Sequence, residues 1–572
     1  MTTTLRGLPA APGIGIGTLI VYRPGLISLD LAQFESAGDP HHEWRRFLDA
    51  HARVDAELEQ LGRHANSLVA EIFAAHRVIL HDQTLLDSIR AAIFDHSRTA
   101  VSATHKVIGE LSDLFRSFED DYFAGRAMDI LDLGQRLLAQ LDISLSQPHL
   151  AHLPPGTILA AEELAPTDLA QLPADHVQGI ALARSTPTAH SAILARALGI
   201  PSVCTLGHGL LQQPSGRPAV VDGYAGHLLL DVDEAELNRY SDLRRRHLDQ
   251  DAAALAHAHT PAHTLDGVWV PVYANANSPQ EVAQNRAAGA DGVGLLRTEY
   301  FFRGRMTPPA CAEQEAAYAE FIGQVDRQLT VRALDTGGDK PVPFIAHHRE
   351  DNPFLGLRGV RLLLEEPELL RTQYRALQSA ARRGPPELDV RFMLPMISTV
   401  EEVLAARAIL GEPLDELPRV KFGVMIEVPS AALVAHSLAP HVDFFSIGTN
   451  DLAQYTLASD RTNSAVAMLA DPLHPAVLQL IQLTCVAALA HGKPVSLCGE
   501  IGGDPAAVPL LLGLGVQELS VPLPAVAVVK ETVRQIDLAD CRRLAAAALA
   551  CARAAEVRQL LRAGQSAGSI TP

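Results

Sequence analysis

Residues 421–428 read KFGVMIEV, and residues 443–451 read DFFSIGTND. Each stretch is a short apolar run rich in Val, Ile and Phe, which is typical of a buried β-strand. The first run ends at Glu427 and the second at Asp451, so a carboxylate closes each of them. Reactive side chains that repeatedly follow buried strands indicate a parallel α/β fold whose site lies at the carboxyl ends of its strands.

Six further apolar runs share this pattern. They occupy residues 268–275, 292–299, 329–335, 389–396, 494–500 and 516–521. Helical stretches separate the runs, which gives eight strand and helix units. Eight such units in roughly 310 residues match a TIM (β/α)8 barrel better than a doubly wound sheet. We therefore predict a C-terminal TIM barrel over residues 263–572.

The N-terminal part of the chain has two other patterns. Short runs bounded by Gly or Pro predict strands near residues 18–22, 156–164, 179–184 and 218–232. Residues 30–141 have long helical periods with few glycines, which predicts a helical-bundle insert. The fold class is therefore multidomain α/β. We assign residues 1–24 and 147–232 to an α/β domain, 25–146 to the helical insert and 233–262 to an exposed linker helix.

Composition narrows the classes of function. The chain has 572 residues, which predicts two to four domains. Its 47 Lys and Arg residues against 66 Asp and Glu residues give a net charge of −19, the wrong sign for a nucleic-acid partner. The six cysteines have no CxxC spacing, and no apolar stretch is long enough to span a membrane. We expect a cytoplasmic protein with reduced thiols and no direct membrane insertion.

Polar residues at the ends of the apolar runs form a candidate site. Arg297, Arg332 and Arg461 carry planar guanidinium groups suited to phosphate and carboxylate. Glu427 and Asp451 can jointly hold one Mg²⁺ ion. The alternative is a general acid and base pair without a metal.

Two further residues, Cys498 and His190, each have a structural and a functional interpretation. Cys498 ends another apolar run, and a buried structural thiol is its simplest interpretation, while proton donation is a hypothesis. His190 is one of 24 histidines, but it directly precedes a predicted short helix that Gly199 ends. A helix N-terminus favours an anionic group such as a phosphoryl group on the imidazole, and Thr188 and Ser191 add hydroxyl donors.

Longer motifs support the functional interpretation. The run TAHSAILARALGIPSV (188–203) is similar to the phosphohistidine loop of phosphoenolpyruvate-utilising enzymes. The barrel adds GVGLLRTE (292–299), VRALDTGGDK (331–340), NPFLGLRGVR (352–361), VMIEVPSAA (424–432), FFSIGTNDLAQYTLASDR (444–461) and CGEIGGD (498–504). Together these motifs resemble enzyme I of the bacterial sugar phosphotransferase system, the phosphoenolpyruvate-protein phosphotransferases, over nearly the whole chain.

The resemblance implies a reaction and a set of site residues. His190 would be phosphorylated at Nε2 and Cys498 would protonate the enolate, which releases pyruvate. Mg²⁺ would bind Glu427 and Asp451. The positions that match the phosphoenolpyruvate-binding residues of the family are Arg297, Arg332, Lys340, Arg358, Asn450, Asp451 and Arg461. The phosphoryl group would then pass to the histidine of the phosphocarrier protein HPr, the first step of sugar uptake by the phosphotransferase system.

The resemblance also implies domain roles. The α/β domain would swivel between a barrel-bound donor and HPr, and the barrel would form a homodimer. The helical insert would dock HPr through the matching positions Phe73, His76, Leu80, Leu85 and Arg126.

The sequence departs from the family pattern in two places. Ser185 and Thr186 stand where the family loop has paired glycines, and Ala189 stands for the serine before the histidine. Ala74 and His81 replace acidic residues of the docking helix. The altered loop leaves open a degenerate regulatory or binding homologue that transfers no phosphate. A relative of phosphoenolpyruvate synthase or pyruvate phosphate dikinase is the other alternative, but we find no motif for the ATP-binding domain of those enzymes.

Overall fold

The computed structural model divides into two compact units. One comprises Met1–His247 with Arg461–Met468, and the other Leu248–Asp460 with Leu469–Pro572. The structure describes residues 2–22, 39–64, 73, 76–117, 121–142, 150, 153–164, 168–169, 172–173, 175–186, 190–302, 305–337, 342, 344–345, 350–411, 419–461, 463 and 466–567. None of the helices in these ranges is both long enough and apolar enough to cross a membrane.

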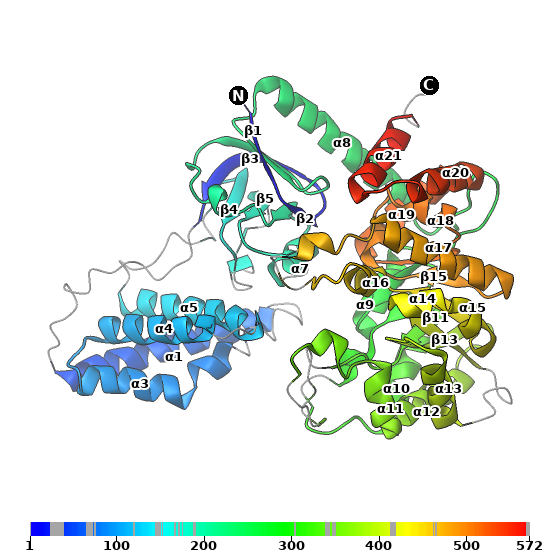
Figure 1. Cartoon of the computed structure of the whole chain (residues 1–572). Helices are drawn as coiled ribbons and strands as arrows, with labels where there is room; N and C mark the ends of the chain where they lie inside the picture. The colour runs from blue at the N-terminus through cyan, green and yellow to red at the C-terminus, as the bar shows by residue number, and fades with distance from the viewer. Residues whose placement is uncertain are drawn as a thin grey trace. The chain divides into compact units, whose positions relative to one another are not determined.

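The second unit is built on a closed barrel of eight parallel strands (Figure 1). The strands are β9 (Val272–Ala276), β10 (Val293–Leu296), β11 (Gln328–Arg332), β12 (Asp389–Leu394), β13 (Val420–Ile426), β14 (Phe444–Ile447), β15 (Val495–Leu497) and β16 (Glu518–Val521). Each strand pairs with the next, and β16 pairs with β9 to close the ring. The predicted TIM barrel is confirmed.

The first strand begins later than the sequence predicts. Apolar residues start at Val268, but β9 starts at Val272. The cause is an antiparallel bridge between His263 and Trp269, which places residues 268–270 in a short hairpin before the barrel.

Helices surround the barrel. They are α9 (Pro279–Ala287), α10 (Cys311–Ile322), α11 (Val360–Glu365), α12 (Pro367–Arg383), α13 (Val400–Leu410), α14 (Pro429–Leu433), α15 (Ala435–Leu438), α16 (Thr449–Thr456), α17 (Pro475–Ala490), α18 (Val508–Gly513), α19 (Val526–Arg534), α20 (Leu538–Leu549) and α21 (Ala554–Ala567). Local sequence sets their ends. Thr399, for example, forms a capping box with Glu402 that starts α13.

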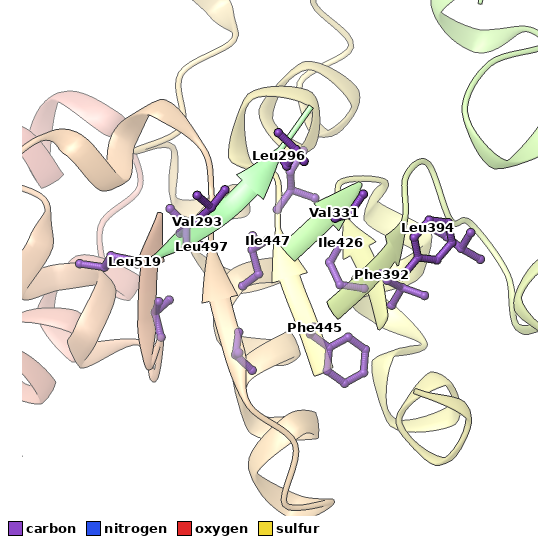
Figure 2. Close-up of a cluster of buried hydrophobic side chains, with 14 of the residues drawn as sticks. Val293, Leu296, Val331, Phe392, Leu394, Ile426, Phe445, Ile447, Leu497 and Leu519 are labelled. Atoms are coloured by element: carbon purple, nitrogen blue, oxygen red, sulfur yellow. The ribbon is translucent and has the colours of Figure 1, made fainter. Parts of the chain in front are cut away.

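Alternate residues of the barrel strands face opposite sides, except in β10, where the pairing register shifts between Val293 and Leu296 and both residues belong to the outer cluster. Figure 2 shows the outward set, which packs against the helices and includes Ile426, Phe445 and Leu497. The residues between them point to the barrel axis, where Met425 and Phe444 pack together. This alternation follows from the two-residue period of a strand. It also means that Glu427, two residues after Met425, shares the inward face.

An ion pair crosses the barrel interior. Arg391 of β12 places Nη1 2.8 Å from Oε2 of Glu518 on β16, four strands away around the ring. The Arg391 guanidinium also lies 5.2 Å from the centre of the Phe444 ring. Glu518 begins β16 and Arg391 is the third residue of β12, so this ion pair lies toward the amino-terminal end of the barrel interior.

The first unit contains a mixed sheet of eight strands. They are β1 (Thr3–Arg6), β2 (Leu8–Ala11), β3 (Ile14–Val21), β4 (Thr157–Ala161), β5 (Val177–Leu182), β6 (Ser202–Cys204), β7 (Pro218–Asp222) and β8 (His227–Leu230), in the order β1-β8-β7-β3-β4-β5-β6-β2. The predicted N-terminal strand lies in β3. It begins earlier, at Ile14, because its first half pairs with β7 before its second half meets β4. The sequence did not predict β1 and β2, which are short and interrupted by Gly7.

The helical insert contains α1 (Pro40–His64), α3 (Gln83–Phe94), α4 (Ala100–Ser117) and α5 (Asp121–Leu141). These helices confirm the predicted bundle. Their apolar faces share one core with the sheet, in which Phe47, Leu58 and Leu133 pack in the same cluster as Leu159 of β4.

Helix α8 (Glu234–Ala256) contains the boundary between the two units, between His247 and Leu248. Its first half packs Tyr240 against Ile14 and Val220 of the sheet. Near its end, Ala254 and Ala258 pack against Ala527 of α19.

A fully buried lysine holds the chain just after α8. Lys530 donates to the carbonyl oxygens of Ala258 at 3.0 Å and Gly289 at 2.6 Å, and pairs with Oδ1 of Asp291 at 2.9 Å. All three hydrogens of the ammonium group are therefore satisfied.

We expect Lys530→Met to lower the free energy of unfolding by about 3–5 kcal/mol, because it leaves the Asp291 carboxylate buried without its cation. Urea denaturation of the barrel would measure this loss. The matched control is Lys421→Met, which removes a solvent-exposed pair with Asp389 and should cost at most about 1 kcal/mol. Similar losses in the two variants would contradict a structural role for the buried pair.

Candidate functional site

The predicted residues of the barrel lie at the carboxyl ends of its strands. Arg332 ends β11, while Arg297, Glu427 and Cys498 directly follow β10, β13 and β15. Each continues the inward alternation of its strand. Chain regions up to about two hundred residues apart thus bring their polar side chains to one end of the barrel.

Arg332 is held by two carboxylates. Its Nη2 donates to Oε1 of Glu299 at 2.6 Å, and its Nη1 lies 3.1 Å from Oδ2 of Asp335. Its buried Nε has no hydrogen-bond partner among the described residues. A buried N–H of this kind is suited to an anionic ligand, because an unmade hydrogen bond in the interior is costly.

Arg358 joins two loops of the site. Its Nη2 lies 3.0 Å from Oδ2 of Asp335 and 3.7 Å from Oδ2 of Asp451, and its Nη1 donates to the Tyr455 hydroxyl at 3.4 Å. The Tyr455 hydroxyl donates in turn to the Phe354 carbonyl oxygen at 2.5 Å. Arg358 is 5% exposed, so these contacts fix its position.

Glu427 is the most buried carboxyl group of the site, at 1% exposure. Its Oε1 accepts a hydrogen bond of 2.6 Å from the backbone N–H of Met396. Met396 follows β12 with a φ of 60°, a left-handed conformation that a non-glycine residue rarely adopts. A side chain at Gly448 would approach Oε2 of Glu427 to 3.0 Å, so this position keeps room beside the second oxygen.

Burial, together with the charges of Asp451 and Asp335, raises the pKa of Glu427 to about 8, while Arg332 and Arg358 act in the opposite direction. The carboxylates therefore crowd negative charge into a buried space. A divalent cation would offset it.

The donor set fits Mg²⁺. Glu427 and Asp451 offer carboxylate oxygens, and Mg²⁺ usually takes one or two carboxylates and completes its octahedron with water and substrate oxygens. Asp451 lies in the first turn of α16, directly after β14. The described residues contain no group of three or more His, Cys, Asp or Glu side chains placed to hold a metal. The carboxylate pair therefore suits a metal shared with a ligand.

Arg297 is the exposed cation at the mouth of the barrel. It forms no ion pair with a described residue, in contrast to Arg332 and Arg358. Loss of solvent around the guanidinium group lowers the pKa of Arg297, and the positive charge of Arg332 lowers it as well. An anion bound beside these two guanidinium groups would relieve their repulsion.

Cys498 lies at the inner edge of the site and is 5% exposed. Its Sγ is 3.6 Å from the carbonyl oxygen of Ile447 and 3.5 Å from Oγ of Ser446. Burial raises the pKa of this thiol, which keeps it protonated at neutral pH. A protonated thiol can serve as an acid.

The other predicted ligand residues have different placements. Asn450 is the second residue of α16, and its Oδ1 accepts a hydrogen bond from the backbone N–H of Glu500 at 3.3 Å. Arg461 belongs to the segment Arg461–Met468, which is grouped with the first compact unit. Lys340 lies outside the described residues. The site roles of Arg461 and Lys340 stay predictions.

His190 is the first residue of α7 (His190–Ala197), one residue before the predicted start of this helix. Gly199 terminates the helix two residues after Ala197: its φ is 68°, and the N–H groups of Gly199 and Ile200 donate to the carbonyl oxygens of Arg196 and Ala195. His190 therefore lies at a helix N-terminus, as predicted; its side chain is outside the described residues.

The unusual loop before His190 is tied to this helix. Ser185, which stands at a glycine position of the family pattern, is buried with its Oγ 3.1 Å from Oγ of Ser191. The Thr205 hydroxyl donates to the Ser185 carbonyl oxygen at 2.7 Å. Serine in place of glycine at position 185 thus adds a hydrogen bond to Ser191, the residue that follows His190. Ala189 lies outside the described residues.

The predicted docking residues of the helical insert need correction. Phe73, His76, Leu80 and Leu85 are at most 3% exposed and belong to the interior of the first unit. Their apolar spacing reflects core packing, and His76 is enclosed with Asp129, 3.1 Å from its Nε2. They present no docking surface. The side chain of Arg126 and residue Ala74 lie outside the described residues, and His81 is exposed beside Asp55.

The structure adds residues to the site that the sequence did not assign. Asp335 and Glu299 lie inside the motifs, and their carboxylates hold Arg332. Tyr455 sits one turn after Asp451 on α16 and holds Arg358. The sequence could have indicated Tyr455, because residues four apart lie on the same face of a helix. Nothing in the sequence indicates the hydrogen bond from the backbone N–H of Met396 to Glu427, because every residue except proline carries a backbone N–H.

Comparisons with known proteins agree with this geometry. Residues 251–538 match the PEP-binding domain of PEP-utilising enzymes, residues 6–126 their N-terminal domain and residues 153–226 their mobile domain. A phosphoenolpyruvate-protein phosphotransferase of Bacillus sp. (strain S) is 37% identical over 97% of both chains, and one of Haloferax volcanii is 38% identical over 98% of this chain and 99% of that protein. The chain therefore belongs to the phosphoenolpyruvate-utilising enzymes, in the group of the phosphoenolpyruvate-protein phosphotransferases, as its motifs predicted.

Some relatives are longer. A multiphosphoryl transfer protein of Rhodobacter capsulatus is 40% identical over 97% of this chain. This chain spans 67% of that protein and 66% of a multiphosphoryl transfer protein of Xanthomonas campestris.

The raised pKa of Glu427 predicts how stability depends on pH. The pKa of an ordinary glutamate is 4.5 and that of Glu427 in the folded protein is about 8, so the folded protein holds the extra proton between these values. The free energy of unfolding of the metal-free protein should therefore fall as pH rises from about 5 to 8. Urea denaturation in the presence of a chelator should give a flatter pH dependence for Glu427→Gln than for the wild type. Parallel curves would contradict the raised pKa.

Proposed function

We propose that the chain transfers the phosphoryl group of phosphoenolpyruvate first to His190 and then to the histidine of an HPr-type phosphocarrier protein. The observation that carries the proposal is the buried ring of charges at the carboxyl end of the barrel, formed by Arg332, Arg358, Glu427 and Asp451. The relatives named phosphoenolpyruvate-protein phosphotransferases support the same chemistry over the full chain.

The charge balance of the site suits this substrate. Three guanidinium groups (Arg297, Arg332 and Arg358) meet four carboxyl groups (Glu299, Asp335, Glu427 and Asp451), which leaves one negative charge in excess when all are ionised. Glu427 and Asp451 would hold a Mg²⁺ ion, which would reverse this sign and supply charge neutralisation for phosphate oxygens. Arg297 and the Nε of Arg332 are then available to the phosphate and carboxylate of the substrate. Arg461, Lys340 and Asn450 would add to the same binding set.

The reaction needs a nucleophile and an acid from this chain. The Nε2 lone pair of His190 forms a bond to phosphorus, and the bond between phosphorus and the enol oxygen breaks, leaving the enolate of pyruvate. The enolate double bond then takes the proton of Cys498 at C3, which gives pyruvate. The N-terminal end of α7 favours the added negative charge on His190.

The domain organisation follows from this sequence of steps. His190 has to meet a barrel-bound donor and then a protein acceptor, so the α/β domain would swivel on the linker that contains α8. The helical insert would dock HPr, but through surface residues other than the buried Phe73, His76, Leu80 and Leu85.

A homodimer through the barrel is part of the proposal. Helix α17 exposes an apolar stripe of Leu483, Val486 and Leu489, and the neighbouring α14 exposes Leu433. Exposed apolar stripes of this kind commonly mark protein interfaces.

A second candidate is a regulatory or binding homologue without phosphoryl transfer. Its support is the altered loop, in which Ser185, Thr186 and Ala189 replace the family residues.

Incubation with phosphoenolpyruvate and Mg²⁺ should add one acid-labile phosphoryl group to the protein, because the donor site and the nucleophile belong to the same chain. Intact mass measurement detects the adduct. His190→Ala should lose it, while His474→Ala, which alters a histidine at the start of α17, should retain it.

An unmodified wild-type mass, or an adduct that persists in His190→Ala, would support the regulatory alternative instead. Transfer of the label to added HPr tests the second half of the proposal.

A charge on the apolar stripe should separate the dimer. We expect Leu489→Glu to weaken association at least tenfold, since a carboxylate would be buried at the interface. Sedimentation analysis over a dilution series measures the dissociation constant. The control is Leu265→Glu, which alters another strongly exposed leucine in the hairpin before β9. Equal association of both variants and the wild type would place the dimer contact elsewhere.

A further inference from the structure

The thiol of Cys498 lies between two chemically different layers of the barrel interior. On one side it packs in a buried apolar cluster whose other members are Leu295, Met393, Met425 and Phe444. On the other side lie charged groups: burial and the charge of Glu427 raise the pKa of the thiol, while the hydrogen bond from Ser446 and the charges of Arg332 and Arg297 lower it. Burial outweighs the arginines. The anion that remains after this thiol gives up its proton therefore needs stabilisation from a nearby donor.

Ser446 supplies such a donor. It is fully buried on the inward face of β14, and its Oγ lies 3.5 Å from Sγ of Cys498. The thiol donates to the carbonyl oxygen of Ile447, with Sγ 3.6 Å from that oxygen, and the Ser446 hydroxyl donates to the sulfur. Figure 2 shows Ile447 on β14 and Leu497 on β15, the outward neighbours of these two inward residues.

We propose that Ser446 is a positioning residue for proton transfer from Cys498 to the enolate. This inference rests on the proposed function. The electron pair of the enolate double bond forms the new C3–H bond, and the S–H bond breaks and leaves its electron pair on sulfur. The Ser446 hydroxyl holds the sulfur in place and stabilises the thiolate, since hydrogen bonds to charged acceptors are the stronger kind. Water then returns a proton to the sulfur.

The neighbouring strand provides a matched control. Ser496 of β15 pairs in register with Ser446 and is also buried, at 3% exposure. Its hydroxyl donates to the backbone carbonyl oxygen of Phe445 at 3.4 Å and makes no hydrogen bond to the thiol. Ser446→Ala and Ser496→Ala therefore remove the same atoms from the same layer, but only the first removes the donor to sulfur.

The test separates phosphoryl transfer from protonation in a single turnover of the full-length protein with phosphoenolpyruvate and Mg²⁺. Quenched intact mass follows the adduct on His190. Lactate dehydrogenase with NADH follows pyruvate, because it reduces the ketone and not the enol. In the wild type both signals should rise together.

In Ser446→Ala the adduct should form within about twofold of the wild-type rate, while the ketone follows at least about tenfold more slowly. The lag should shorten as buffer concentration rises, because released enolpyruvate is then protonated in solution. Cys498→Ala should show the same lag. Ser446→Thr, which keeps the hydroxyl, should largely remove it, and Ser496→Ala should behave as the wild type.

In Ser446→Cys the new side chain is nearly the size of serine, but its thiol is only a weak hydrogen-bond donor. If Ser446→Ala does not fold, Ser446→Cys should therefore show the same lag of the ketone behind the adduct. Coincident adduct and ketone signals in both Ser446 variants would overturn the inference while leaving the proposed function intact, and an equal lag in Ser496→Ala would also overturn it. A wild-type protein that forms no adduct would overturn the proposed function and the inference with it.

Discussion

The burial of Glu427 is the constraint on which the rest of the site depends. A carboxyl group at 1% exposure is costly unless its charge is balanced and its oxygens are hydrogen-bonded. The protein meets both conditions with Arg332 at the end of β11, with Arg358 in the connection that follows this strand, and with the backbone N–H of Met396. Each arginine is in turn held by Asp335.

This constraint links local geometry to chemistry. Met396 adopts a left-handed conformation just after β12, and Gly359, also left-handed, leaves room beside it, since a side chain there would approach the Met396 side chain to 2.8 Å. Strained or permissive backbone is expected where a site has to be held in one geometry. The result is a carboxylate with one oxygen fixed and the other beside Gly448, in a site that favours a divalent cation and an anionic ligand together.

The two units contribute different kinds of chemistry. At the barrel site Arg332 and Arg358 are paired with carboxyl groups, whereas Arg297 forms no ion pair with a described residue. The first unit presents His190 at the start of a short helix on a loop held by Ser185 and Thr205. In the proposed function, His190 has to contact a donor and then an acceptor, and a residue on a surface loop can do this more readily than a residue in a buried site.

The sequence by itself determined the barrel, the placement of Arg297, Arg332, Glu427 and Cys498 at strand ends, and the helix that begins at His190. It could do so because strand alternation, helix ends and the family motifs are properties of neighbouring residues. Only the tertiary structure decided that Glu299 and Tyr455 hold the arginines, because each of these pairs joins different connections of the barrel, and that Asp335 contacts both Arg332 and Arg358. It also decided that Phe73, His76, Leu80 and Leu85 belong to a core, because an apolar residue at helical spacing can face a partner protein or its own interior, and only packing distinguishes the two.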